Sequence, residues 1–481
     1  MQKKFLLIFS ALVLVFGFYG VFYAQKIPIA EGKGWDGALY VEYVQQWPDP
    51  ILKKELPPYY LKRTLLPAML HYACSVQATI QGITVQQIPE ATILRYFDCF
   101  NMICLCLIFF LLYKIFIKVF AERFTSQPWW IMLWAGMNVY IMKMTFYYPA
   151  LLDTFACMLG ALMLYGHLNR KNYWILIAMA AGYFTHPLLF VMGAVLLLWP
   201  EAITFKRSIH SIVVWIIISL FAALFSYWLY DSYVFYPDGV RPVEERWIWL
   251  SALCTVTYLS YVLYTSALIR DGINYLFQLR WLNLIPVAIL YTLLSWIVES
   301  FRNEQPGWKL SDFLHTTGYD SMQDPFIFIV AHVVYFGPGT LVLFIFADQW
   351  KEWLRQQTGG LQLVIWMMFV LMVNNESRQL IVFWPFALLL IIKIVSEWKH
   401  NYIRYIVALI LIIASRFWLD MHTFANGDYF EFPAQYYFMH MGPWMSVDNY
   451  NWQAAVAFFM GVLIFRYKKE LDKNEENNLA S

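Results

Sequence analysis

Apolar runs of about twenty residues recur along the whole chain and limit what it can fold into. A helix needs roughly 17–25 apolar residues to cross a bilayer, and lipid tolerates only segments whose backbone hydrogen bonds are satisfied internally. Charged residues make up 14% of the chain, against roughly 25% in soluble domains, which is too little to cover a water-soluble fold of this length. The runs therefore predict an all-α integral membrane protein with a bundle of about 14 (12–14) transmembrane helices. They lie at about 5–24, 97–118, 129–147, 150–167, 173–185, 187–203, 208–230, 248–268, 281–299, 326–347, 361–374, 378–396, 402–419 and 453–466.

The basic residues predict the orientation of these runs. With the N-terminus in the cytoplasm, every inside loop carries Lys or Arg, as the positive-inside rule requires; examples are Lys206 with Arg207 and Lys351 with Arg355. Both termini are then expected in the cytoplasm, most simply at a bacterial inner membrane. The first run has no small-x-small cleavage site after it, so we expect it to remain as an uncleaved span.

The domain organisation follows from this topology. Residues 1–466 are expected to form a single polytopic transmembrane domain, and 467–481 a disordered cytoplasmic tail. The six cysteines form no metal-type CxxC pairs, and the net charge of +2 shows no nucleic-acid footprint. Outer segments rich in acidic and aromatic residues are expected at 25–96, which includes an interfacial helix over 65–80, and at 231–247, 300–325 and 420–452.

The first outer segment contains Trp35-Asp36-Gly37, with Tyr40 three residues further on. Asp36 lies about a dozen residues past the first span, close to the membrane surface, where a carboxylate could deprotonate a hydroxyl nucleophile. Flanking glycines permit tight turns and the close approach of a ligand. The alternative interpretation is an Asx-turn, since Asp beside Gly is ordinary turn chemistry.

A second acid follows in the turn Tyr147-Tyr148-Pro149-Ala150-Leu151-Leu152-Asp153, between the third and fourth runs. With Trp-Asp-Gly-x-x-Tyr after the first span, this layout resembles the GT-C glycosyltransferases, membrane enzymes that use lipid-phosphate-linked sugars. The resemblance implies that Asp36 and Asp153 are catalytic acids beside one outer pocket. For Asp153 the alternative is a helix N-cap.

Several cations could hold the donor phosphate. Lys62 and Arg63 lie beside aromatic residues, and Arg378 with Glu376 interrupts the apolar region 361–396; a planar guanidinium is suited to grip a phosphate. His186, in the next outer turn, could orient a phosphate or a hydroxyl. The alternatives are headgroup-level loop charges, a structural His, and a local Glu376–Arg378 pair.

The substrate sugars need stacking and hydrogen-bonding partners, for which Trp35, Tyr40, Glu376 and Tyr429 are the candidates. A divalent cation, Mg²⁺ or Mn²⁺, held by Asp36 and Asp153 is left open, and no other cofactor is expected. The expected reaction is hexosyl or pentosyl transfer with inversion, from a polyprenyl-phosphate donor to a glycan or lipid-linked acceptor on the non-cytoplasmic face.

Two alternatives share the membrane setting. A transporter or flippase of a lipid-linked glycan should carry ionisable residues deep in its spans; the charges here cluster at the outer face, although Asp98 and Lys143 lie in or near apolar runs. An oligosaccharide polymerase would share the carrier and the side, and two outer-loop arginines in place of the Trp-Asp-Gly acid would favour it.

Overall fold

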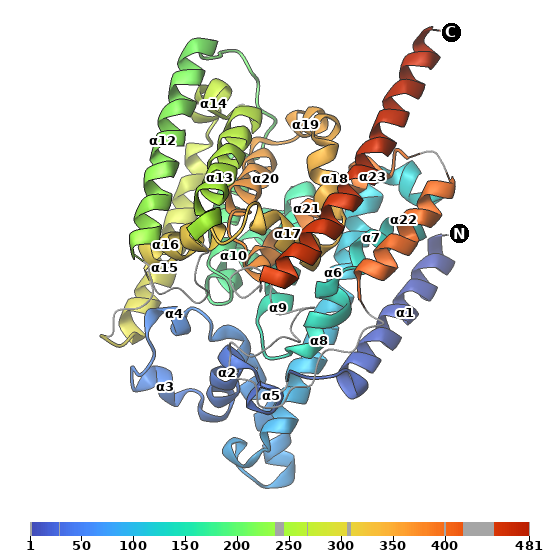
Figure 1. Cartoon of the computed structure of the whole chain (residues 1–481). Coiled ribbons are helices and arrows are strands. Elements are labelled where there is room, and N and C mark those ends of the chain that lie inside the picture. The colour runs from blue at the N-terminus through green and yellow to red at the C-terminus, as the bar shows by residue number, and fades with distance from the viewer. Residues whose placement is uncertain are drawn as a thin grey trace.

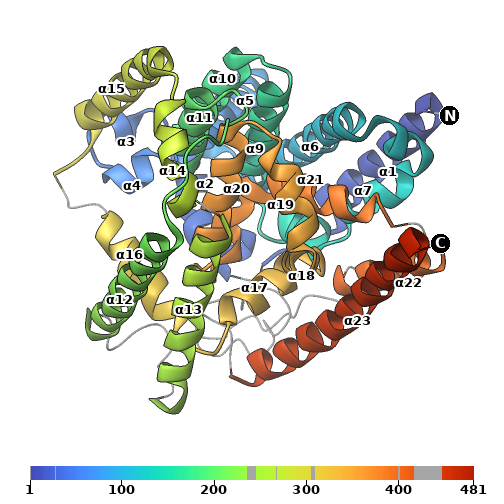
Figure 2. The ribbon, with the colours of Figure 1, turned by 90° about the horizontal axis from the view of Figure 1, so that it is seen from above.

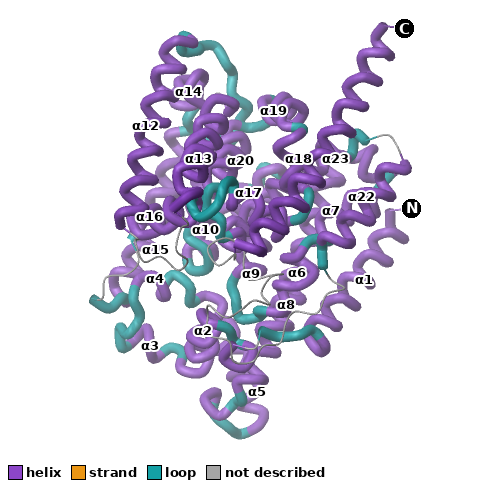
Figure 3. Tube along the Cα trace, viewed as in Figure 1, coloured by secondary structure: helices purple, strands orange, loops and turns teal. Residues whose placement is uncertain are grey.

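The computed structural model describes residues 2–27, 29–235, 245–266, 268–304, 309–398, 401–416 and 447–480. All regular secondary structure in these ranges is helical, and no strand occurs in them (Figure 3). The all-α prediction is confirmed for this part of the chain. A helix satisfies its backbone hydrogen bonds within itself, which is the condition that lipid imposes.

Six of the described helical segments are long enough and apolar enough to cross a membrane, fewer than the fourteen runs expected. The difference arises because several runs form apolar helices of only 10–17 residues. The six segments lie in α1 (Gln2–Tyr23), α6 (Glu90–Ser126), α12 (Ser211–Phe235), α13 (Glu245–Ser266), α15 (Leu284–Phe301) with the turn η4 (Trp281–Asn283) before it, and α21 (Trp384–Val395) with η5 (Ser377–Phe383) before it. The shorter apolar helices are α11 (Leu188–Leu198), α17 (Ile327–Phe336), α20 (Gly359–Leu371) and α22 (Asn401–Ala414).

The centre of the bundle is formed by α20, α21 and α9 (Asp153–Leu168), with α1, α12, α15 and α23 (Val447–Ala480) around the edge (Figure 2). The span at η5 and α21 is 83% buried by protein, whereas the spans of α12 and α15 are 17% buried. Helix α9 touches η5 through Gly160, where an added Cβ would lie 2.4 Å from the Val382 carbonyl oxygen. This close backbone contact holds the start of α9 near the polar residues at the start of η5.

One expected run, 129–147, is not a continuous helix. It is divided into α7 (Pro128–Gly136), a π-helical turn η3 (Tyr140–Met144) and α8 (Thr145–Tyr147). The break lies at Asn138, whose side chain donates to the Ala135 carbonyl (3.1 Å) and accepts from the Ile141 N–H (2.9 Å). A polar side chain that binds backbone groups in this way competes with the regular helix.

Short helices between α1 and α6 form a cap at one end of the molecule (Figure 1). The expected helix over 65–80 is present as α5, whose residues Leu66, Leu70, Cys74 and Ala78 are buried while Tyr72 and Ile80 are exposed. This pattern of one buried and one exposed apolar face suits a helix lying at an interface. The cap contains η1 (Ile29–Gly32), α2 (Trp35–Gln46), α3 (Asp49–Leu52), α4 (Pro58–Leu61), α5 (Leu65–Gln81) and η2 (Val85–Gln87).

The opposite end carries α14 (Leu268–Phe277), α19 (Ala347–Arg355) and the end of α23 (Figure 1). The tail expected to be disordered is helical through Ala480, because it is rich in good helix formers, has no Gly or Pro after Gly461, and is anchored by an ion pair between Lys468 and Asp348 (2.7 Å). The remaining helices are α10 (Asn172–Tyr183), α16 (Leu310–Ser321) and α18 (Gly339–Ile345).

Candidate active site

Asp36 lies in the first turn of α2, inside the cap. The residue before this helix, Gly34, has φ of +70°, and an added Cβ there would lie 2.3 Å from the Tyr148 ring, so only glycine fits. The phenol of Tyr148 in turn accepts hydrogen bonds from the backbone N–H groups of Asp36 and Gly37. The start of α2 is thereby fixed against the turn that follows α8, and the helix dipole favours a negative charge at Asp36.

Two guanidinium groups flank the Asp36 carboxylate. Asp36 Oδ2 is 4.0 Å from Arg63 Nη1 and 3.8 Å from Arg378 Nη2. Both distances exceed the roughly 2.7–3.2 Å of an N–H···O hydrogen bond. The carboxylate therefore attracts each of the two cations without a direct hydrogen bond to either. Each of the three side chains keeps 24–30% of its surface exposed.

Arg63 is held in place by aromatic side chains. Its guanidinium carbon lies 3.8 Å from the centre of the Tyr59 ring, and its Nη1 donates to the Tyr59 hydroxyl. Tyr40 hydrogen-bonds the same guanidinium from α2. Burial raises the pKa of both tyrosines, so they remain neutral phenols beside the cation. Lys62 is turned elsewhere: its Nζ lies 5.3 Å over the Tyr183 ring, which does not support the predicted phosphate contact for this residue.

Arg378 comes from the polar interruption between α20 and α21. Glu376 accepts hydrogen bonds from Arg378 Nε and from the Gln379 side chain, so the local Glu376–Arg378 pair is present. The other end of the same guanidinium reaches Asp36. The pair and the longer contact coexist, because Arg presents donors on two edges of its planar group.

Asp153 is the first residue of α9 and the N-cap position is occupied by Leu152, so the N-cap interpretation of Asp153 is not supported. The charged groups that act on its carboxyl are, in decreasing order, Arg378, Glu376, Arg63 and Asp36. Asp153 thus shares one electrostatic environment with Asp36, with Arg378 as its strongest partner.

His186 lies in the turn between α10 and α11 and hydrogen-bonds the backbone of Gln379. Burial, reinforced by Arg63 and Arg378, lowers the pKa of His186 to about 4, so the imidazole is neutral at physiological pH. Its Nδ1 is buried and has no hydrogen-bond partner among the described residues. Trp35 lies beside the cluster, with its ring 6.4 Å from that of Tyr148. Tyr429 falls outside the described residues.

Sequence reasoning missed three residues at this site. Tyr59 and Tyr148 position Arg63 and the start of α2, and the spacing of Tyr59 four residues before Arg63 was an available signal for their contact. Asp320, at the end of α16, is 6% exposed, and its backbone carbonyl accepts from the Asn375 side chain (3.0 Å). Burial and the nearby Glu376 raise the pKa of Asp320 well above its usual range.

A divalent cation does not fit the residues that are present. No group of three or more metal-ligating side chains occurs in the described ranges. The charged groups closest to Asp36 are two guanidiniums, which repel a cation.

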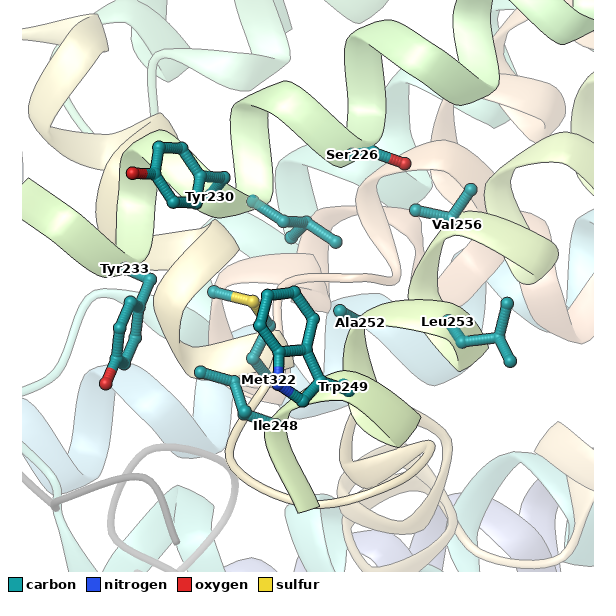
Figure 4. Close-up of a pocket in the computed structure, with 10 residues that line it drawn as sticks. Ser226, Tyr230, Tyr233, Ile248, Trp249, Ala252, Leu253, Val256 and Met322 are labelled. Carbon is teal, nitrogen blue, oxygen red and sulfur yellow. The ribbon is translucent and has the colours of Figure 1, made fainter. Parts of the chain in front are cut away.

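An apolar groove of about 550 Å³ runs between α12 and α13 (Figure 4). Tyr230 and Tyr233 line it from α12, Trp249 and Leu253 from α13, and Met322 closes one side. Met322 follows Asp320 by two residues, and Asp320 acts electrostatically on Glu376. The Asp320 carbonyl accepts a hydrogen bond from Asn375, the residue before Glu376, so the segment that carries Met322 contacts the segment that carries Glu376.

Asp98, the acid expected near an apolar run, is 1% exposed and forms an ion pair with Lys26 (2.6 Å). Lys26 also donates to the Phe146 carbonyl (2.9 Å), so this pair ties the segment after α1 to α6 and α8.

Comparisons with protein-family models, with curated proteins and with solved structures find nothing that matches this chain. What the charged cluster does is therefore inferred from the chemistry of its own residues.

Proposed function

We propose that this chain is a membrane glycosyltransferase of the GT-C type, with about fourteen transmembrane segments. It transfers a hexose or pentose from a polyprenyl-phosphate donor to a hydroxyl of a glycan or lipid-linked acceptor. Its cap faces the non-cytoplasmic side, in a bacterial inner membrane with both termini in the cytoplasm. The observation that carries the proposal is the position of the Asp36 carboxylate, 3.8–4.0 Å from two guanidiniums that it does not directly bind.

This arrangement supplies both charges that the reaction needs. A carboxylate can take the proton from an acceptor hydroxyl, and two cations can stabilise a departing phosphate. Arginine suits the second task because it stays charged and presents a rigid fork of donors to phosphate oxygens. The gap beside Asp36 leaves donors of Arg63 and Arg378 available for a substrate oxygen.

The proposed step is a single displacement. The acceptor oxygen forms a bond to the anomeric carbon while its proton passes to the Asp36 carboxylate. The bond between the anomeric carbon and the phosphate oxygen breaks, and the polyprenyl phosphate leaves with the bonding electron pair, next to Arg63 and Arg378. One displacement inverts the anomeric centre. Asp153 and Glu376 accept hydrogen bonds from sugar hydroxyls, and Trp35 offers an aromatic face for stacking.

The lipid part of the donor needs an apolar surface that is open to the bilayer. The groove between α12 and α13 supports this requirement, because Trp249 and Leu253 are 77% and 62% exposed and face the surrounding medium.

Two alternatives remain distinguishable. A transporter is less well supported, because Asp98 is neutralised by Lys26 in a pair that joins structural elements. An oligosaccharide polymerase would be favoured by two outer arginines in place of the Trp-Asp-Gly acid, whereas here Arg63 and Arg378 lie beside Asp36. The product distinguishes a polymerase from a single-sugar transferase, because a polymerase extends its acceptor by whole repeat units and a transferase adds one sugar.

The test is sugar transfer in membranes from a strain that lacks the gene, complemented with Asp36→Asn or with Asp49→Asn. Asp49 is the matched control, because it is an exposed acid of the same cap that pairs with Lys53 (2.8 Å). We expect Asp36→Asn to abolish the product seen by mass spectrometry of lipid-linked and surface glycans, and Asp49→Asn to restore it. Full restoration by Asp36→Asn would remove Asp36 from the reaction.

A further inference from the structure

Besides the apolar groove there is a polar cavity of about 650 Å³. The residues that line it include those of α14 and α19, which lie at the end of the molecule opposite the cap. It is bordered by α14 and α19, with contributions from α13 and α20. Arg270, Asp271, Lys351 and Arg355 line it together with the aromatic side chains of Tyr264 and Trp366. None of these residues takes part in the cluster around Asp36.

The cavity carries more positive charge than its central acid can neutralise. Asp271 is 5% exposed and accepts two hydrogen bonds from Arg270 (3.1 and 3.0 Å) and one from Arg355 (3.1 Å). One carboxylate balances only one of the two guanidiniums. Within the part of the chain that the structure describes, Arg355 contributes a single hydrogen bond from its five N–H donors, and its side chain remains 51% exposed.

Lys351 adds a third cation. Its ammonium lies 5.3 Å from the Tyr261 ring and 5.9 Å from the Trp350 ring, and no carboxylate of the described chain is within ion-pair distance of it. Burial lowers the pKa of Lys351, and Asp348 offsets part of that effect. Three acids line the cavity: Asp271, Asp348 and Glu352. Asp348 forms an ion pair with Lys468, so besides Asp271 this leaves Glu352 to offset the charge of the cations.

The surrounding helices are suited to the depth of lipid headgroups. On α14 the polar residues Asp271 and Asn274 are buried, whereas Leu276 and Phe277 are 67% and 70% exposed. The exposed apolar surface continues through Trp281 and Leu282 in the next turn. A helix with a polar inner face and an exposed apolar outer face lies in the membrane interface.

We propose that this cavity binds the phosphate of an anionic lipid headgroup in the leaflet at this end of the molecule. Arg355 and Lys351 direct donors at the phosphate oxygens, Arg270 and Asp271 hold Arg355 in place, and the exposed apolar residues of α14 border the acyl chains. Basic pockets between helices at headgroup level recognise such lipids in this way. The proposal does not depend on glycosyl transfer.

The test uses the purified full chain in detergent, with binding followed by native mass spectrometry and by thermal melting. The probes are short-chain phosphatidylglycerol, short-chain phosphatidylcholine and inorganic phosphate. We expect phosphatidylglycerol to bind and to raise the melting temperature, and Arg355→Gln to weaken this binding by about tenfold, the value of one charge-assisted contact. Lys351→Gln should weaken it in the same direction.

Arg280→Gln is the matched control, because Arg280 lies at the same end but pairs with Glu201 (3.1 Å) outside the cavity. Arg355→Gln should fold, since Asp271 keeps both hydrogen bonds from Arg270; melting without lipid checks this. Equal binding of phosphatidylglycerol by Arg355→Gln, Lys351→Gln and the parent would overturn the proposal, as would equally tight binding of phosphatidylcholine. A full response to inorganic phosphate alone would assign the cavity to free phosphate instead of a lipid.

Discussion

Each end of this molecule has an aspartate between two arginines, and the two groups differ in how closely the charges approach. Asp271 accepts hydrogen bonds of 3.0–3.1 Å from Arg270 and Arg355. Asp36 lies 3.8 and 4.0 Å from Arg378 and Arg63. The first carboxylate is used to hold its arginines, whereas the second is left available between its cations. One aspartate and two arginines thus form an anchor at one end and a site open to substrate at the other.

After the loss of product expected for Asp36→Asn, the largest effect is expected from removing one of the two cations beside Asp36. Arg63→Gln should reduce sugar transfer by roughly 10²–10³-fold, because it removes one donor to the leaving phosphate. The measurement is the initial transfer rate with a polyprenyl-phosphate sugar in membranes. Arg302→Gln is the control, since Arg302 is exposed and pairs with Glu299 outside the cluster. An Arg63→Gln rate within a few-fold of the parent would mean that this guanidinium does not face the phosphate.

The next effect separates the two aspartates by stability. Asp271→Asn should destabilise the protein by about 1–3 kcal/mol, because it weakens charge-assisted hydrogen bonds at a buried carboxylate; the half-exposed arginines place the value toward the lower end. Asp36→Asn breaks no direct hydrogen bond to its arginines and should cost less than about 1 kcal/mol. Thermal melting of both variants in one detergent compares them. Equal losses of stability in the two variants would contradict the different roles assigned to Asp271 and Asp36.

The sequence predicted the individual charged residues around Asp36 better than it predicted that they lie close together in the fold. Asp36, Arg63, Arg378 and Asp153 were chosen because each is a charge beside an apolar run or a glycine, which is local information. Their convergence requires contacts between segments far apart in the chain, such as the contact of α9 with η5 at Gly160, which joins residues more than 200 positions apart and which no local pattern contains.

The same limit explains where the structure differs from what the local pattern suggests. The apolar pattern located α1, α6, α12 and α15, because a run of apolar residues is itself the signal for a span. It could not show that Asn138 binds the backbone and divides the run 129–147, or that Lys62 turns toward Tyr183. The missed Asp320 lies in a segment that reads as an ordinary outer turn until α16 brings it beside Glu376.

A smaller effect is expected from pH, through His186. Its pKa in the folded protein is about 4, below the value of roughly 6.5 in an unfolded chain. Between these values the unfolded state binds the extra proton, so His186 lowers stability as the pH falls from about 6.5 toward 4. His186→Asn should therefore lose less melting temperature than the parent over that range. An identical acid response of the two proteins would show that His186 does not remain neutral beside Arg63 and Arg378.

The smallest effect is expected from metal removal. Because guanidiniums occupy the surroundings of Asp36 where a cation would have to lie, EDTA should leave the rate of sugar transfer unchanged. The assay compares membranes treated with EDTA before and after Mg²⁺ is restored. A loss of activity that Mg²⁺ reverses would contradict this interpretation of the open site.

The most direct test is a structure of the protein with polyprenyl phosphate bound. We expect the phosphate within hydrogen-bonding distance of both Arg63 and Arg378, next to the Asp36 carboxylate, with the lipid chain leading toward the groove between α12 and α13. A phosphate bound elsewhere, with Asp36 closed onto one of its arginines as Asp271 is onto Arg270, would contradict the account.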